Sequence, residues 1–229
     1  FITGATSGIG LKIAQLCIER GYDVYATGRN DASLKTLSNL GAHAIKADLR
    51  KKYELDYVLA QLPELDVVIL NAGLGIFNNA YDLSDEQVDE MFDVNVHAPI
   101  YLARKIAPKL IERKKGHFII ISSQAGKVAT KKASIYASTK HALTGFINGF
   151  RLEVEQYNIN KGYNSELLKN CRELKEYMIY VDTVRKNCEI MSLEKAVESA
   201  VDECISNGIL REFLMNNKAE VTRMSIFEY

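Results

Sequence analysis

The sequence predicts an α/β fold built on a doubly wound parallel sheet, with helices on both faces. Short apolar runs alternate with amphipathic stretches from residue 1 to about residue 157, and the apolar runs contain few polar positions. Strands of that kind are buried on both faces, as in parallel sheets, whose βαβ crossovers are right-handed. In addition, 12 of the 14 glycines lie at or before Gly149 and all three prolines lie in the first half, so the turn-forming residues belong to this part.

The elements follow in order along the chain. Strands are predicted where short apolar runs occur, at residues 1–3, 22–27, 42–46, 65–70 and 117–121. Helices are predicted where apolar residues recur every three or four positions, at residues 9–20, 31–39, 52–61, 84–113 and 134–157. The first helix stops at Gly21, and the long helical region 84–113 is expected to bend near Pro99.

Composition excludes several classes of protein. The 229 residues include 29 Lys+Arg and 29 Asp+Glu, so the net charge gives no basic footprint for nucleic acid or for an anionic membrane. No apolar run approaches the roughly 18 residues that a membrane span needs. The chain begins at Phe1 without a secretory pattern, and its four cysteines form no CxxC pair. We therefore expect a cytoplasmic protein with reduced thiols and no metal site.

A glycine-rich loop joins the first strand to the first helix. Its GxxxGxG spacing lets the backbone turn sharply and approach a pyrophosphate at the helix N-terminus. An ordinary turn is the alternative, and the strand–loop–helix context favours nucleotide binding. The candidate cofactor-binding residues of the loop are Thr3, Gly4, Ser7, Gly8, Ile9 and Gly10.

The end of the second strand bears on the choice of dinucleotide. A free ribose 2′-hydroxyl calls for a carboxylate there, whereas a 2′-phosphate calls for an arginine. The sequence has Arg29 and Asn30 after Gly28 and no acidic residue, so it favours NADP over NAD. A solvated surface arginine is the alternative interpretation.

Two further strand ends carry candidate cofactor-binding residues. Asp48 and Leu49 follow the third strand, where a carboxylate can accept a hydrogen bond from the adenine amino group. Asn71, Ala72 and Gly73 follow the fourth strand, and Gly73 permits close backbone approach. Each alone is also compatible with simple turn chemistry; their recurrence at equivalent strand ends favours a site.

Four residues are candidates for catalysis. Tyr136 and Lys140 are four residues apart and share one helix face, so the ammonium can lower a phenol pKa that is normally near 10. Ser123 follows the fifth strand and can donate to a substrate oxygen that gains charge. Asn95 lies within a helix and can hold a water that relays protons to Lys140, and the alternative is an incidental helical asparagine.

Residues 1–157 resemble the short-chain dehydrogenase/reductase family. The resemblance rests on TGATSGIG (3–10), Asp48-Leu49, NAG (71–73), Asn95, Ser123 and YASTK (136–140), in that order. It implies a Rossmann-like fold and an NADP-dependent oxidoreductase that acts on a carbonyl or alcohol substrate. Tyr136 would be the general acid and base, Ser123 would polarise the carbonyl, Lys140 would bind the nicotinamide ribose and tune Tyr136, and Asn95 would continue the relay. The resemblance also implies a homodimer or tetramer.

The family pattern stops after the helix that follows YxxxK. No proline follows Pro108, so the Pro-Gly turn over the nicotinamide is absent, and so is a further Val/Ile-rich strand. Amphipathic spacing in residues 158–229 predicts a helical tail, which resembles the C-terminal part of PD-(D/E)XK nuclease-family transposase proteins without a catalytic set. We therefore expect an incomplete NADP-binding oxidoreductase domain at 1–157 and a helical tail at 158–229. The alternatives are a catalytically impaired nucleotide-binding or interaction protein from a fusion or truncation, and a tail that binds a partner.

Overall fold

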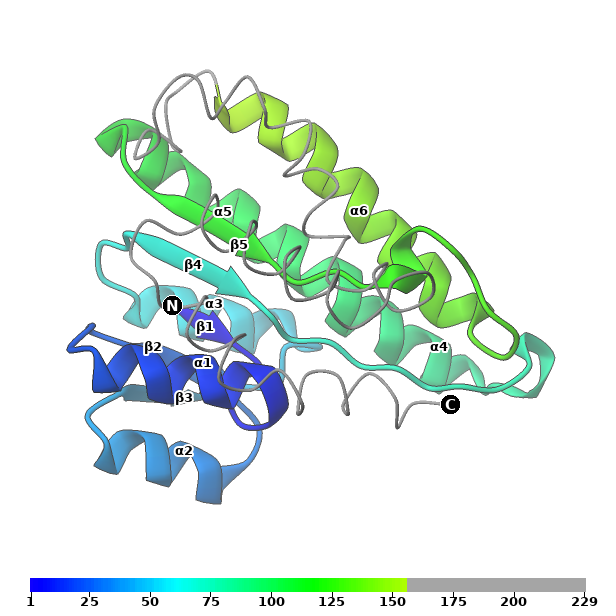
Figure 1. Ribbon diagram of the computed structural model, residues 1–229, viewed down its shortest axis with the longest axis horizontal. Coiled ribbons are helices and arrows are strands. Elements are labelled where there is room, and N and C mark those ends of the chain that lie inside the picture. Colours follow the sequence, from blue (N-terminus) through cyan, green and yellow to red (C-terminus); the bar gives the residue numbers. More distant parts are fainter. Residues whose placement is uncertain (156–229) are drawn as a thin grey trace, which may run out of the picture.

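The centre of the molecule is a parallel sheet of five strands, seen in a computed structural model that describes residues 1–155 (Figure 1). Its strands are β1 (Ile2–Thr3), β2 (Tyr25–Gly28), β3 (His43–Lys46), β4 (Val67–Leu70) and β5 (His117–Ile120). They are ordered β3-β2-β1-β4-β5, and each neighbouring pair is parallel. The predicted doubly wound sheet is confirmed for this part of the chain, and every strand ends at the same edge.

Six α-helices connect and cover the strands in the described residues. They are α1 (Gly8–Glu19), α2 (Asp31–Asn39), α3 (Lys52–Gln61), α4 (Asp85–Phe92), α5 (Ala98–Arg113) and α6 (Ser134–Glu155). Helices α1 and α2 lie on one side of the sheet, and α5 and α6 lie on the other (Figure 1). The predicted tail 158–229 and the end of the last predicted helix lie outside the described residues.

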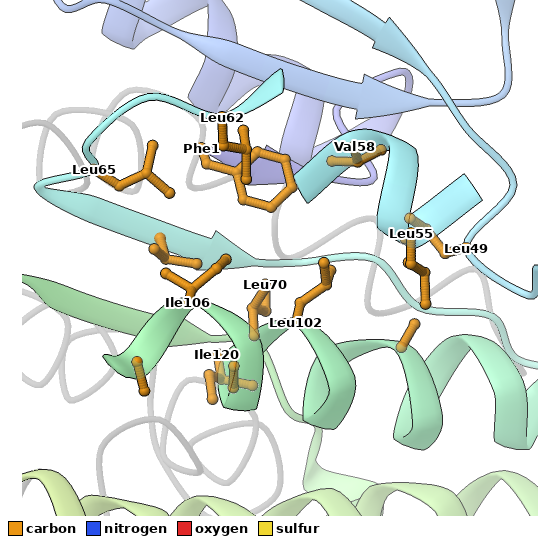
Figure 2. Close-up of a cluster of buried hydrophobic side chains, with 14 of the residues drawn as sticks. Phe1, Leu49, Leu55, Val58, Leu62, Leu65, Leu70, Leu102, Ile106 and Ile120 are labelled. Carbon is orange, nitrogen blue, oxygen red and sulfur yellow. The ribbon is translucent and has the colours of Figure 1, made fainter. Parts of the chain in front are cut away.

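Two hydrophobic cores follow from the alternation of side chains along the strands. Val68 and Leu70 of β4 point to the core that α3, α5 and α6 cover, and Ile69 points to the core that α1 and α2 cover. Figure 2 shows the first core, with Leu55 and Val58 of α3 and Leu102 and Ile106 of α5 against the sheet. Because both faces are buried, the strands carry the near-continuous apolar runs seen in the sequence.

The predicted helical region 84–113 is divided into three parts. A π-helical segment, η2 (Asp93–His97), separates α4 from α5, and Pro99 lies in the first turn of α5. Pro99 has no N–H to donate to the carbonyl of Asn95 four residues earlier, so one hydrogen bond of the α-helical pattern is missing at this point. Instead, the Ala98 N–H donates to the carbonyl of Asp93, five residues back. The α-helical hydrogen bonding of the region is therefore interrupted just before Pro99, the residue near which the sequence predicted a bend.

Candidate functional site

The carboxyl ends of the strands bring the sequence-predicted residues to one edge of the sheet. The candidate cofactor-binding residues up to Gly73, and also Ser123, lie at or just after the carboxyl ends of β1 to β5, with Gly8, Ile9 and Gly10 in the first turn of α1. In open parallel sheets, ligands bind beyond this edge. Helix η2 supplies Asn95, and α6 supplies Tyr136 and Lys140.

The glycine loop turns sharply into the N-terminus of α1. Gly4 and Gly8 have φ angles of +65° and +50°, a region that glycine adopts without a steric penalty. A Cβ on Gly10 would lie only 2.3 Å from the carbonyl oxygen of Gly4, so the helix could not pack this closely on the loop with any other residue there. Ser7 is the N-cap of α1, its side chain makes no capping hydrogen bond, and Ile9 lies in the first turn. The first-turn N–H groups therefore face the edge of the sheet without a side-chain acceptor from their own cap.

Thr3 and Asn71 hold this loop against the end of β4. The hydroxyl of Thr3 accepts hydrogen bonds from the N–H groups of Asn71 and Ala72, both at 3.1 Å. The Asn71 side chain donates to the carbonyls of Thr3 and Gly4, at 3.1 and 3.3 Å. Thr3 and Asn71, both predicted to bind the cofactor, thus stabilise the loop, and their side chains already form hydrogen bonds within the protein.

Arg29 and Asn30 differ in their surroundings. The side chain of Asn30 caps α2 by accepting from the N–H of Ser33 at 2.9 Å. Arg29 is 58% exposed, and its Nη1 lies 3.5 Å from Oε1 of Glu90. An exposed guanidinium at the end of β2 is available to an anionic ligand, whereas Asn30 also has a structural role.

Asp48 is paired with Arg50, a residue that the sequence reading did not single out. The Nε of Arg50 lies 2.9 and 3.0 Å from the two carboxylate oxygens of Asp48, and Nη2 also donates to Oδ2. These hydrogen bonds from Arg50 hold the pKa of Asp48 below its usual value. Leu49, predicted to bind the cofactor, has its side chain in the hydrophobic core, so only its backbone can face a ligand.

Lys140 connects the two halves of the site. Its side chain is 4% exposed, and its ammonium donates to the carbonyl of Ile121 at 3.4 Å and lies 5.8 Å from the ring centroid of Tyr136. A Cβ on Gly73 would lie 3.3 Å from the same nitrogen and 3.6 Å from Oδ1 of Asn95. Lys140, a predicted catalytic residue, and the predicted cofactor loop after β4 therefore meet at Gly73.

Asn95 is buried and hydrogen-bonded. Its Oδ1 accepts from the N–H of Leu74 at 2.7 Å, and its Nδ2 donates to the Leu74 carbonyl at 2.7 Å and to the Thr139 hydroxyl at 2.9 Å. The side chain fastens the loop after β4 to the turn of α6 that contains Thr139. These contacts give Asn95 a structural role, and its part in a proton relay stays a prediction.

Ser123 is the N-cap of the short helix η3 (Gln124–Gly126), and its hydroxyl accepts from the N–H of Ala125 at 3.2 Å. Helix η3 lies directly against α6, since a Cβ on Gly126 would lie 2.9 Å from the carbonyl oxygen of Lys140. The contact between η3 and α6 thus fixes the segment that carries Ser123 relative to the helix that carries Lys140.

Phe77 is a further residue at the site that sequence reasoning missed. Its ring centroid lies 5.3 Å from that of Tyr136, and the planes are inclined by 59°. Phe77 is 39% exposed, and Gly75 makes room for it, because a Cβ there would meet the Phe77 ring at 2.9 Å. An aromatic residue in a loop carries no periodic signal, so the sequence could not reveal this contact.

Two structural findings bear on other site types. Within residues 1–155, no helix combines the length and hydropathy that crossing a bilayer requires. In the same part of the chain, no three His, Cys, Asp or Glu side chains gather closely enough to hold a metal ion.

Comparisons with known proteins agree with this geometry. The family described as short chain dehydrogenase matches residues 1–161. An uncharacterized oxidoreductase of Staphylococcus aureus is 35% identical over 161 residues, which are 67% of this chain and 70% of that protein. The NADP-dependent 3-hydroxy acid dehydrogenase YdfG of Salmonella typhi is also 35% identical over 161 residues, but the match spans only 63% of its length.

Solved structures of dehydrogenases are also similar to this chain in fold. Serine dehydrogenase from Escherichia coli has a TM-score of 0.62 and 33% identity, and the match covers 66% of this chain and 74% of that one. A short-chain dehydrogenase from Sphingobium yanoikuyae in complex with NADPH has a TM-score of 0.65 and 28% identity, and the match covers 69% of this chain and 66% of that one.

Proposed function

The chain belongs to the short-chain dehydrogenase family, which is a family of oxidoreductases. We propose that it transfers a hydride between NADP(H) and a carbonyl or alcohol substrate. Tyr136 is the general acid and base of this proposal. The observation that supports it most is that Lys140 and Asn95 both lie close to Gly73, in the loop after β4. Lys140 is one helical turn from Tyr136 in α6.

The residues at the edge of the sheet fit a dinucleotide. The N-terminus of α1, reached through Gly4 and Gly8, offers N–H groups to a pyrophosphate, and its Ser7 cap leaves them without a side-chain acceptor. Asp48 and the backbone of Leu49 would border the adenine, and Lys140 would bind the nicotinamide ribose. When bound, the cofactor supplies or accepts the hydride.

NADP rather than NAD is supported by the end of β2. No acidic residue stands at positions 28–30, directly after the strand, to bind a free ribose 2′-hydroxyl, and the exposed Arg29 can bind a 2′-phosphate. The Salmonella relative is NADP-dependent by its description, and serine dehydrogenase has been solved with NADP+.

Proton transfer would be the task of Tyr136. In the direction of reduction, its hydroxyl donates a proton to the substrate oxygen as the carbonyl carbon gains the hydride, and in oxidation its phenolate takes the proton back. The buried Lys140 ammonium, 5.8 Å from the ring centroid, stabilises the phenolate. Ser123 would donate to the same substrate oxygen, and Asn95 would support a water that returns protons to Lys140.

The experiment that tests this proposal compares the wild-type chain with Tyr136→Phe. We expect NADPH consumption with a panel of aldehydes and ketones to fall by at least about a hundredfold, because the proton donor is lost. The Kd of NADPH, measured by calorimetry, should remain within about threefold, a difference below the 1.4 kcal/mol of one tenfold step. Tyr136→Phe with undiminished turnover would overturn the assignment.

A second candidate is a protein that binds the dinucleotide without turning over a substrate. The observation that favours it is the end of the family match at residue 161, beyond which the sequence has no Pro-Gly turn. The same calorimetry and turnover measurements separate the two functions. This second function predicts NADPH binding with no consumption of NADPH by any carbonyl in the panel.

A further inference from the structure

A cluster of charged side chains lies beside the predicted adenosine end of the cofactor site. Arg29 follows β2, Arg50 follows β3, and Glu90 belongs to α4. Nη1 of Arg50 lies 2.9 Å from Oε1 of Glu90, and Nη1 of Arg29 lies 3.5 Å from the same oxygen. We call these three residues the arginine–glutamate cluster.

Asp48 determines which edge of Arg50 faces Glu90. The carboxylate of Asp48 holds the Nε and Nη2 side of the guanidinium, and it is itself only 14% exposed. Because a guanidinium is planar and rigid, fixing that side also fixes Nη1 toward Glu90 and Arg29. The arrangement keeps two cations around one oxygen.

Both arginines retain hydrogen-bonding capacity. Of the five N–H groups of Arg50, three have acceptors on Asp48 and Glu90, and in residues 1–155 the other two have none. Among the described residues, Arg29 makes one hydrogen bond, through Nη1, and its side chain is 58% exposed. Arg50 is 36% exposed and Glu90 26% exposed, so the cluster is reachable from solvent.

We propose that Arg29 and Arg50 together bind the 2′-phosphate of NADP(H), and that Glu90 is a resident counter-ion which the phosphate displaces from them. This inference rests on the proposed function, since it concerns the cofactor of that site. Oε1 of Glu90 takes the place between two guanidinium groups that a phosphate oxygen takes in a two-arginine site. Glu90 thereby reduces the repulsion between the arginines when no cofactor is bound.

The proposal assigns opposite effects to two neighbouring residues. Arg50 adds a charge-assisted hydrogen bond to the phosphate, so it favours NADPH over NADH. The negative charge of Glu90 competes with the phosphate for the same donors, so it weakens the binding of NADPH. Because of Glu90, the preference for NADPH over NADH is smaller than it would be with the two arginines and no neighbouring carboxylate.

The test measures the Kd of NADPH and of NADH by calorimetry for the wild-type chain, Glu90→Gln and Arg50→Gln. We expect Glu90→Gln to lower the Kd of NADPH about three- to tenfold, with the Kd of NADH within about twofold, because a carboxylate near the phosphate is neutralised without loss of shape. Arg50→Gln should raise the ratio of the NADPH Kd to the NADH Kd about tenfold, since a hydrogen bond to a charged group is lost. Arg50→Lys should lie between Arg50→Gln and wild type.

Two controls separate these effects from general charge and folding effects. Asp89→Asn removes the same charge from an exposed neighbour in α4, and Arg113→Gln removes an arginine that pairs with Glu64 and Asp66 before β4. Both should leave the ratio unchanged.

Two results would overturn the proposal while the wild type still binds NADPH. If Arg50→Gln weakens both cofactors equally, Arg50 acts only by holding Asp48. If Glu90→Gln weakens NADPH, Glu90 supports the site instead of competing for it. A wild-type chain that binds neither cofactor would instead refute the proposed function itself.

Discussion

Asn95 illustrates how one buried side chain can join three parts of the site. Its amide binds both backbone groups of Leu74 and the hydroxyl of Thr139, so the loop after β4 and the helix α6 keep a fixed separation. Lys140 is the next residue after Thr139, and its ammonium lies next to Gly73, which precedes Leu74. The position of the ammonium therefore depends on the hydrogen-bond network of Asn95.

Gly73 provides the most specific test at this scale. In Gly73→Ala the new Cβ would approach the Lys140 nitrogen to 3.3 Å, so the ammonium must shift. We expect turnover to fall about tenfold to a hundredfold, as small misplacements of reacting groups do. The thermal midpoint should change little, because the displaced atom ends a flexible side chain.

Gly145→Ala in α6 is the matched control, since a Cβ there meets no atom of residues 1–155 within 4 Å. It should leave turnover unchanged and stabilise the helix by about 0.5–1 kcal/mol. Equal turnover in Gly73→Ala and Gly145→Ala would contradict the role given to the Gly73–Lys140 contact.

Single residues could be predicted from the sequence where their spacing along one element defines their geometry. Tyr136 and Lys140 are of this kind, because four residues make one helical turn. Arg50 and Glu90 could not be found, since their contact joins positions 40 apart through the packing of α4 beside the end of β3. The contact of Phe77 could not be predicted for the same reason, because its partner Tyr136 is remote in the sequence.

At the scale of elements, α4 has the best-defined beginning. The Ser84 hydroxyl accepts from the N–H of Gln87, and the Gln87 side chain accepts from the N–H of Ser84, which completes a capping box. This cap positions the helix that carries Glu90 and leads into η2. Its end is less regular, because Pro99 interrupts the hydrogen bonding beyond it.

The cap makes a measurable contribution to stability. We expect Ser84→Ala to lower the free energy of unfolding by about 1 kcal/mol, because the N-terminal N–H of Gln87 loses its acceptor. Urea denaturation of the two proteins measures this difference. Ser38→Ala, at an exposed position in α2, serves as control and should change stability by less than about 0.5 kcal/mol. A loss in Ser38→Ala equal to that in Ser84→Ala would show that the cap is not responsible.

Periodicity in the sequence predicts whether a segment is a helix or a strand, but it does not predict where a long helical region is divided into separate helices. Each predicted strand contains one of the five observed strands, or overlaps it, because buried strands are short apolar runs between turns. The region 84–113 has helical periodicity throughout; Pro99 marks the place where the sequence predicted a bend, but the bounds of η2 come only from the structure. The short helices η1 (Ala80–Asp82) and η3 lie in polar segments with no periodicity to detect.

At the scale of the whole molecule, stability should depend on pH through His117. Burial at the start of β5 lowers the pKa of His117 below its usual value. The unfolded chain therefore takes up a proton before the folded chain does, and stability is lost as the pH falls through the usual value of about 6.5 toward the lowered one. Above that window the contribution is constant.

Thermal melts at pH 7.5 and pH 5.5 check this expectation. The wild-type midpoint should be lower at pH 5.5, and His117→Gln should reduce that difference because it removes the titrating group. An identical pH-dependent change in both proteins would assign the effect to other groups.

The parallel sheet gathers the site at one edge, and the chain order of the motifs alone was enough to predict this. The carboxyl ends of parallel strands share an edge, so residues after β1, β2, β3 and β4 must lie together whatever their distance in sequence. The division into 1–157 and 158–229 stays a prediction, since its second part lies outside the described residues.

The most direct test of the proposed reaction follows the hydride from the cofactor to the substrate. The wild-type chain is incubated with NADPH deuterated at the transferred position of C4 and with the carbonyl that it reduces best, and the alcohol is analysed by mass spectrometry. We expect one deuterium on the former carbonyl carbon of the alcohol, and we expect Tyr136→Phe to form much less of this product. An alcohol without deuterium, or equal deuterated product from both proteins, would contradict the proposed reaction.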